Sequence, residues 1–455
     1  MQAVTLTLAG IFGVLTLFMR PTRALAVYFV LLLAYPTFLV VQLGTLDISA
    51  ARIVGGVLLM RCLFDASLLS KFKWCRLDTW IMFMMVVTVL VPLAAWKMPS
   101  MKVLENRSGF IMDSYMAYFL ARFCVSDYRS LITVARWVTP VVVALAVLGM
   151  VESVYGIQPF NALRRFCPWR PTAPSLAENI RSGYYRAVGP SGHPILFGAS
   201  FVMFVPFIWS LRHEKSSWKN WAYIGGIFAS IGAMSSMSSA PWMMVVMVWG
   251  CLMMERFKYL AKPLLGLTIG SCFVVDIISN RTFYHVMASY ANPIGGSGWH
   301  RAKLIDLAIE HFNEWWLMGY GGLDPGWGSQ LGMTWTDITS HYISVGVFYG
   351  VWGVIGLVGL MATAVLLLIR AHNKAKDPTF KSWCWAFGSL LTVLAVAFTS
   401  CTFFDQTRTH FYAMLGMIAS MVHGQPALEK SQLRARLSRL ARASGREPDR
   451  VPVLK

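Results

Sequence analysis

Residues 341–369 read HYISVGVFYGVWGVIGLVGLMATAVLLLI and contain no Asp, Glu, Lys or Arg. A helix needs about 20 mainly apolar residues to cross the hydrocarbon core of a bilayer, so this run alone predicts a membrane-spanning helix. Comparable apolar runs recur from Leu6 to Ile418. The chain of 455 residues is 56% hydrophobic and 13% charged, whereas a soluble domain is typically about 25% charged. The sequence therefore indicates a membrane protein.

The apolar runs predict an all-α polytopic membrane protein with about 12–13 transmembrane helices. The expected spans are residues 4–19, 24–43, 48–63, 79–96, 109–125, 137–156, 194–211, 221–236, 239–255, 259–278, 341–369, 382–400 and 410–423. The first two runs alternatively form a re-entrant hairpin, so both counts remain open. The eight cysteines are scattered without a CxxC pair, and we interpret them as packing residues.

The net charge of +19 comes largely from basic clusters in short connections between apolar runs. The clusters are Arg20 and Arg23; Lys71, Lys73 and Arg76; Arg212, Lys215 and Lys219; Arg256, Lys258 and Lys262; Arg370, Lys374, Lys376 and Lys381; and the tail from Arg434 to Arg450. Alternating spans place every cluster on one face, which the positive-inside rule makes cytoplasmic. We therefore expect a multi-pass protein of a bacterial inner (plasma) membrane, in contact with lipids and not with nucleic acid.

This sidedness divides the chain into six parts. They are N-terminal transmembrane helices (1–156), a first periplasmic loop (157–193), central transmembrane helices (194–278), a large periplasmic catalytic loop carrying short helices (279–340), C-terminal transmembrane helices (341–423) and a basic cytoplasmic tail (424–455). Both loops mix Trp, Tyr, Gly and Pro with isolated charges, as folded interfacial structure does. We therefore expect the functional site on the periplasmic side.

The first loop ends in YYRAVGPSGHPILFG, residues 184–198. Backbone N–H groups of a glycine-rich turn, together with the positive end of the following helix, favour an anion. Arg186, Gly189 and Ser191 are therefore candidate binding residues, although Arg186 alternatively reaches only a lipid phosphate at the membrane surface. His193 is a further candidate, and a role at the helix boundary before Pro194 is the simpler interpretation.

Residues 299–312 in the second loop predict a helix on which one charge is out of place. At about 100° per residue, Arg301 shares the face of apolar residues, and the opposite face is charged. The apolar face carries Ile305, Ala308 and Phe312, and the charged face carries Lys303, Asp306, Glu310 and Glu314. An arginine on an apolar face needs an anion, because burying it unpaired is costly. Substrate and structural carboxylate both remain open as that anion.

The second loop closes with Asp337, Ser340 and His341, directly before the span at 341–369. A histidine at the outer edge of a bilayer can be largely neutral near physiological pH and take a proton from an attacking hydroxyl. A hydrogen-bonded packing role is the alternative for this lone histidine.

The order of these pieces resembles the O-antigen ligase and O-antigen polymerase superfamily, which includes exopolysaccharide polymerases and bacterial oligosaccharyltransferases. Its members carry an arginine-glycine segment like residues 186–189, and an arginine-bearing helix in a large periplasmic loop like Arg301. The turn at 317–321, with Tyr320, is similar to a family turn in which proline is usual where Trp316 stands here. Ser340 and His341 match the family's Ser-His-Asn, with Tyr342 in place of the asparagine.

The resemblance implies a GT-C-like glycosyltransferase, a ligase or polymerase of the exopolysaccharide and lipopolysaccharide kind. It would move a glycan from an undecaprenyl (polyprenyl) diphosphate donor to a hydroxyl of a saccharide or lipid A-core type acceptor, alongside polysaccharide-assembly proteins. Arg186 and Arg301 would bind the diphosphate and His341 would be the general base, without metal or cofactor. The further substrate-binding candidates are Gly189, Ser191, His193, Tyr320, Asp337 and Ser340. Arg122 and Arg408 are weaker candidates, and the alternative for each is a role as a boundary or ion-pair residue.

Two other classes remain open. A polytopic transporter or flippase of lipid-linked saccharides would share the many spans and the basic inner face, but the runs show no two-fold repeat of broken helices. A structural scaffold would explain the basic tail through anionic lipid or a cytoplasmic partner, and would leave Arg301 unexplained.

Overall fold

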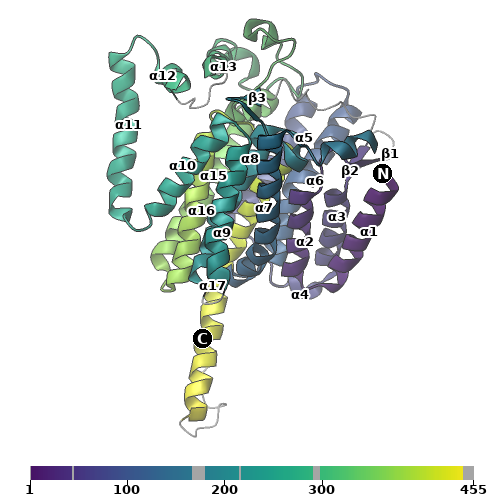
Figure 1. The fold of residues 1–455 in the computed structure, drawn as a ribbon, viewed down its shortest axis with the longest axis vertical. Coiled ribbons are helices and arrows are strands. Elements are labelled where there is room, and N and C mark those ends of the chain that lie inside the picture. Colours follow the sequence, from purple (N-terminus) through teal and green to yellow (C-terminus); the bar gives the residue numbers. More distant parts are fainter. Residues whose placement is uncertain (1, 44–45, 167–179, 215–216, 291–297, 444–455) are drawn as a thin grey trace.

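The computed structural model describes residues 2–43, 46–166, 180–214, 217–290 and 298–443, and Figure 1 shows their arrangement. These residues are mainly helical, which confirms the expected all-α fold class. Parts of the two expected loops, at 167–179 and 291–297, lie outside the described residues, as do Cys167, Lys215 and residues 444–455 of the expected tail.

The described chain forms helices joined by short turns, with two small hairpins. The helices are α1 Gln2–Phe18, α2 Pro21–Ala34, α3 Ala50–Phe64, α4 Ala66–Leu69, α5 Arg76–Ala94, α6 Ser100–Cys124, α7 Tyr128–Tyr155, α8 Pro194–Trp209, α9 Trp218–Ser235, α10 Ser239–Met253, α11 Ala261–Ile278, α12 Phe283–Tyr290, α13 Gly298–Glu310, α14 Phe312–Trp315, α15 His341–Lys374, α16 Pro378–Ala397 and α17 Asp405–Ala443. The strands are β1 Val40–Leu43, β2 Leu46–Ser49, β3 Ile180–Arg181 and β4 Tyr184–Tyr185. β1 pairs with β2 and β3 with β4, both antiparallel.

Each expected span overlaps one of these helices, but not every helix has the length and apolarity of a membrane crossing. Among the described residues, six do: Arg76–Ala94, Tyr128–Tyr155, Pro194–His213, Lys258–Ile278, His341–Lys374 and Pro378–Ala397. The apolar helices α1, α2 and α10 are shorter. α3 has only 15 residues, and the first half of α6 carries Lys102, Glu105 and Arg107. The structure thus supports six spanning helices by length and composition, and the higher count stays a prediction.

The expected span at 24–43 is wrong in its second half. α2 ends at Ala34, and Tyr35 has the extended backbone that the residue before a proline prefers, here before Pro36. The chain then enters the β1–β2 hairpin, in which Val40 pairs with Ser49. This hairpin brings polar residues to the end of the bundle, where they line a cavity described below.

α6 and α17 lie side by side and run in the same direction along the bundle. The ring centroids of Tyr115 and Tyr412 are 5.1 Å apart near one end, and Arg122 meets Ser420 further along. The hairpins, α12 and α13 gather at one end of the bundle, whereas α4 and the C-terminal part of α17 lie at the other (Figure 1). We call the first of these the hairpin end.

α15 is broken at Gly350, where φ is 62° and ψ is −160°. The break frees backbone groups that the loop then binds: Tyr320 N donates to Val347 O at 2.6 Å, and Val351 N donates to Trp316 O at 2.6 Å. A Cβ on Gly350 would lie 2.3 Å from Leu317 O. The glycine-rich turn singled out in the sequence is therefore the element that docks the large loop onto α15.

Gly350→Ala is expected to detach this turn. The conformation at Gly350 is nearly restricted to glycine, so strain alone costs about 1–3 kcal/mol and the clash with the docked backbone adds to it. We expect a Tm several degrees lower and faster proteolysis within residues 312–322. Gly388→Ala in α16 is the matched control, because a Cβ there meets nothing within 4 Å. Equal Tm values for the two variants would contradict the docking role.

Candidate functional site

The turn between α16 and α17, residues 398–404, holds the start of α15 in place. Phe398 O accepts hydrogen bonds from His341 N at 2.7 Å and from Ser340 Oγ at 3.2 Å. Thr402 Oγ1 donates to Ile338 O at 2.7 Å. These three hydrogen bonds fix the start of α15 and the residues just before it to this turn. The position of His341 therefore depends on a distant part of the chain, since Ser340 and Phe398 are 58 residues apart in sequence.

His341 is buried among aromatic rings of the same turn. Its ring centroid is 4.5 Å from that of Phe398 and 6.3 Å from that of Phe403. Its Nδ1 is buried and has no hydrogen-bond partner. Ser340 caps α15, with its Oγ accepting from Ile343 N at 3.5 Å, so Ser340 is a positioning residue for His341. The Nδ1 of His341 is therefore not engaged by another side chain and is available to exchange a proton or a hydrogen bond with a bound hydroxyl.

α13 carries Arg301, as the sequence predicted, but the buried face of the helix differs from the expected one. Leu304 and Leu307 are fully buried, whereas Phe312 is 48% exposed. The cause is that α13 ends at Glu310, so Phe312 belongs to the separate α14 and leaves the predicted face. Arg301 lies at the edge of the buried face, and its Nε is buried without a hydrogen-bond partner.

The surroundings of Arg301 do not neutralise it. Burial lowers the pKa of Arg301 and so does the charge of Arg181, whereas Cys401 and Asp337 act in the opposite direction. Burial raises the pKa of Cys401 to about 12, so this neighbour is a neutral thiol at physiological pH. None of the ion pairs between described side chains includes Arg301. Its electrostatic setting therefore favours an added anion.

Arg186 is in a similar position. Its Nη2 donates to Ser238 Oγ at 2.9 Å, and its Nε is buried without a partner. Burial together with the charge of Arg181 lowers the pKa of Arg186 to about 10, so the side chain stays charged at neutral pH at an energetic cost. Arg181, which the sequence did not single out, thus lies close enough to both Arg186 and Arg301 for its charge to act on them.

The glycine-rich turn before α8 already holds an anion from the chain itself. Val188 N and Gly189 N each donate to a carboxylate oxygen of Glu152 at 3.0 Å. A Cβ on Gly189 would lie 2.4 Å from the ring of Phe197. These N–H groups are therefore not available to a substrate, which corrects the expectation for Gly189. The signal was present in the sequence, since a glutamate in an apolar run needs a buried partner.

Ser191 and His193 line a cavity, whose lining includes neither Arg186 nor Arg301. The ring centroid of His193 is 5.6 Å from that of Phe404, and its Nδ1 is buried without a partner. Burial and the charge of Arg186 lower the pKa of His193 to about 4. His193 therefore lies between the cavity and the arginines as a neutral ring.

The pH dependence of stability should report on His193. In the unfolded chain a histidine binds its proton near pH 6.5, but in the folded protein His193 binds it only near pH 4. Between these values the unfolded state holds more protons. The free energy of unfolding therefore decreases as the pH is lowered from 6.5 towards 4, by at most roughly 3 kcal/mol. Tm curves from pH 7.5 to 4.5 should be flatter for His193→Gln than for wild type. Parallel curves would contradict the assignment.

Two further arginines lie at the hairpin end. The guanidinium of Arg408 sits 4.0 Å over the ring of Phe110, and its charge acts on His341. Arg107 donates from Nη1 to Tyr349 Oη at 2.8 Å. The Nε of each is buried without a partner. Arg107 escaped the sequence analysis because the first half of α6 is rich in charge and reads as a solvated face.

Arg122 and Tyr320 are not brought to this site. Arg122 is held by Asp78 through bonds of 2.8 and 2.9 Å, and it also reaches Ser420, which is about 18 Å along α17 from Arg408. Tyr320 donates to Glu314 at 2.6 Å within a small core under the large loop. Asp337 lies nearer, with its backbone carbonyl contacting Nε2 of His300 at 2.9 Å and its charge acting on Arg301.

The fold and the site together define a class: a mainly helical protein with helices long enough to cross a membrane, and with several buried arginines at one end. Within the described ranges no group of three or more His, Cys, Asp or Glu could hold a metal ion. Comparison with family models and with curated proteins finds no match for the chain. The chemistry of the site therefore has to be argued from its own residues.

Proposed function

We propose that the chain is a membrane glycosyltransferase that moves a glycan from a polyprenyl diphosphate to an acceptor hydroxyl, as a polysaccharide polymerase or ligase. The observation that carries the proposal is the arginine cluster, defined as Arg186, Arg301 and Arg408, each with a buried and unpartnered Nε. Arg301 acts on Cys401 and Arg408 acts on His341 beside the 398–404 turn, and Arg186 acts on His193, whose ring contacts Phe404 of that turn. This arrangement supports the resemblance to the O-antigen ligase and polymerase superfamily.

A diphosphate suits this cluster better than a single carboxylate does. Arg186 and Arg301 come from the two separate loops, and the charge of Arg181 penalises both of them. A diphosphate offers several oxygens to planar guanidinium forks and carries enough negative charge to offset more than one arginine. The negative charge on the leaving diphosphate grows during transfer, so these cations would stabilise the transition state more than the ground state.

His341 would complete the reaction. The acceptor oxygen forms a bond to the anomeric carbon, the bond from that carbon to the phosphate oxygen breaks, and the lipid diphosphate leaves with the electron pair. The proton of the acceptor hydroxyl passes to the imidazole of His341.

The same reasoning proposes a location. The basic turns and the tail would lie in the cytoplasm, and the hairpin end would face the periplasm of a bacterial inner membrane. The six long apolar helices support a membrane location by length and composition. The donor would then be reached after its transfer to the outer leaflet.

The test is transfer by the purified chain in lipid vesicles, supplied with a polyprenyl-diphosphate-linked oligosaccharide and a saccharide acceptor. We expect a longer or newly linked glycan and the release of polyprenyl diphosphate. Movement of the intact lipid-linked donor between leaflets, without any new glycosidic bond, would instead support the transporter reading. If a strain that lacks this protein and its paralogues still makes glycans of unchanged chain length and linkage, the glycosyltransferase proposal is overturned.

A further inference from the structure

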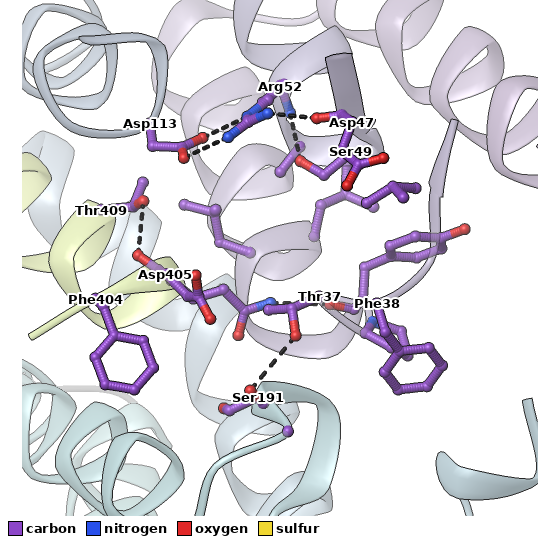
Figure 2. Close-up of a pocket in the computed structure, with 18 of the residues that line it drawn as sticks. Thr37, Phe38, Asp47, Ser49, Arg52, Asp113, Ser191, Phe404, Asp405 and Thr409 are labelled. Atoms are coloured by element: carbon purple, nitrogen blue, oxygen red, sulfur yellow. Dashed lines mark hydrogen bonds and ion pairs between the residues drawn. The ribbon is translucent and has the colours of Figure 1, made fainter. Parts of the chain in front are cut away.

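A cavity of about 420 Å³ lies at the hairpin end, and His193 in its wall is close enough to Arg186 for the two side chains to interact electrostatically. Its walls come from four parts of the chain: residues 28–40 and 47–52, which belong to α2, the β1–β2 hairpin and the start of α3; the middle of α6; the turn before α8; and the start of α17. Figure 2 shows Arg52, Asp47, Ser49 and Asp113 on one side, with Asp405 and Ser191 elsewhere around the cavity. Walls contributed by four separate parts of the chain indicate a formed binding site rather than a shallow surface depression.

The cavity has the opposite charge to the arginine cluster. Its lining includes Asp47, Asp113 and Asp405 against the single arginine Arg52, with His193 neutral at physiological pH. Arg52 is bound to Asp113 through two bonds of 2.6 and 2.7 Å. Excess negative charge disfavours a phosphate or a carboxylate as ligand. The described lining also lacks a metal-holding group.

The remaining lining suits a sugar. Thr37 Oγ1, Thr409 Oγ1 and Gln406 Nε2 each donate to a backbone carbonyl, so these side chains offer mainly their oxygens as acceptors for sugar hydroxyls. The carboxylates of the lining are stronger acceptors for the same hydroxyls. The aromatic rings of Phe38 and Phe404 supply apolar surface for the carbon-bearing face of a pyranose. A mixture of aromatic surface and a few fixed polar groups favours an uncharged, hydroxyl-rich ligand.

The cavity also lies beside the proposed base. Phe404 lines the cavity, and the residue before it, Phe403, lies with its ring 6.3 Å from the ring of His341. His193 contacts Phe404 from the other side, at 5.6 Å between ring centroids. With the diphosphate at the arginine cluster, the inference requires a hydroxyl of a sugar in the cavity to reach His341 past the Phe403–Phe404 segment.

The geometry points to this cavity as the acceptor subsite, where the terminal sugar of the acceptor binds through its hydroxyls. The inference rests on the proposed function and narrows it: the sugar that receives the glycan is uncharged or an amino sugar, not a uronic acid or a phosphorylated sugar. The acidic lining of the cavity then disfavours the anionic donor, whereas the arginine cluster favours it, so the two substrates are distinguished by charge.

The test uses Asp405→Asn and Asp47→Asn in the vesicle transfer assay. Asp405 has φ of 46°, a conformation that asparagine tolerates, so the change removes charge without backbone strain. We expect the KM for the acceptor to rise about tenfold, as loss of a charge-assisted hydrogen bond predicts, with the KM for the donor unchanged. Asp127→Asn is the matched control, because Asp127 caps α7 at the other end of the bundle and asparagine caps equally well.

The outcomes separate this inference from the proposed function. Transfer with an unchanged acceptor KM in both variants, or a raised KM for the donor instead, would overturn the subsite and leave the glycosyltransferase standing. If the wild type transfers nothing, binding of the free oligosaccharide cleaved from the donor is measured by thermal shift. Binding that both variants weaken would support a saccharide site in a protein of another function, and no binding would overturn the subsite as well.

Discussion

Replacing Arg301 by alanine is expected to lower the rate of glycan transfer by about a thousandfold while leaving the protein at least as stable as the wild type. Arginines that stabilise the developing charge in phosphoryl transfer raise the rate by about 10³–10⁵. We expect a value at the low end, because Arg186 would also stabilise the charge on the leaving diphosphate. The expectation for stability has a separate cause. The Nε of Arg301 is buried and unpartnered, so its removal takes away an energetic cost rather than a contact.

This pairing of effects makes the Arg301 experiment decisive. If Arg301 is structural, its replacement should lower both the stability and the activity of the protein. If Arg301 binds substrate, its replacement should lower the activity alone. The measurements are initial transfer rates in vesicles and Tm in detergent for Arg301→Ala, for Arg301→Lys, and for Arg281→Ala as an exposed control at the same end. Lysine should restore only part of the rate, because it cannot form the bidentate contact. Full activity in Arg301→Ala would remove this residue from the site.

The helices were predictable because each depends on a local pattern. Long apolar runs bounded by charge or proline fixed the approximate ends of the helices, including α13 in the large loop. The errors arose where a neighbour in space decides the outcome. The end of α2 gave way to a hairpin after Pro36, and the buried face of α13 shifted because the helix stops at Glu310.

The site was predictable where one residue stands out against its own surroundings. Arg301 on a largely apolar helix and His341 at the start of an apolar run have that property. Glu152 does not reveal its partners, because the N–H groups it binds lie 36 and 37 residues along the chain. The acidic cavity was also invisible, since Arg52 and Asp113 are 61 residues apart and meet only in the folded protein.

Replacing His341 by alanine is expected to lower kcat for transfer by about 10²–10⁴, the usual contribution of a positioned general base. The KM for the donor should change little, because the arginines that would hold the diphosphate are untouched. His341→Gln keeps similar bulk against Phe398 and Phe403 but cannot take up a proton at neutral pH, so it should be as inactive as alanine with less loss of stability.

The pH profile distinguishes a base from a packing residue. With His341 as the base, the wild type should lose kcat as the pH falls and the ring becomes protonated, and this acidic limb should disappear in the residual activity of His341→Gln. Ser340→Ala should lower kcat to an intermediate value and keep the acidic limb of the pH profile. Ser340 only positions His341, through the hydrogen bond from Ser340 Oγ to Phe398 O. A fully active His341→Gln variant would assign the ring to packing. The arginine cluster would then have to act on a hydroxyl deprotonated by another group.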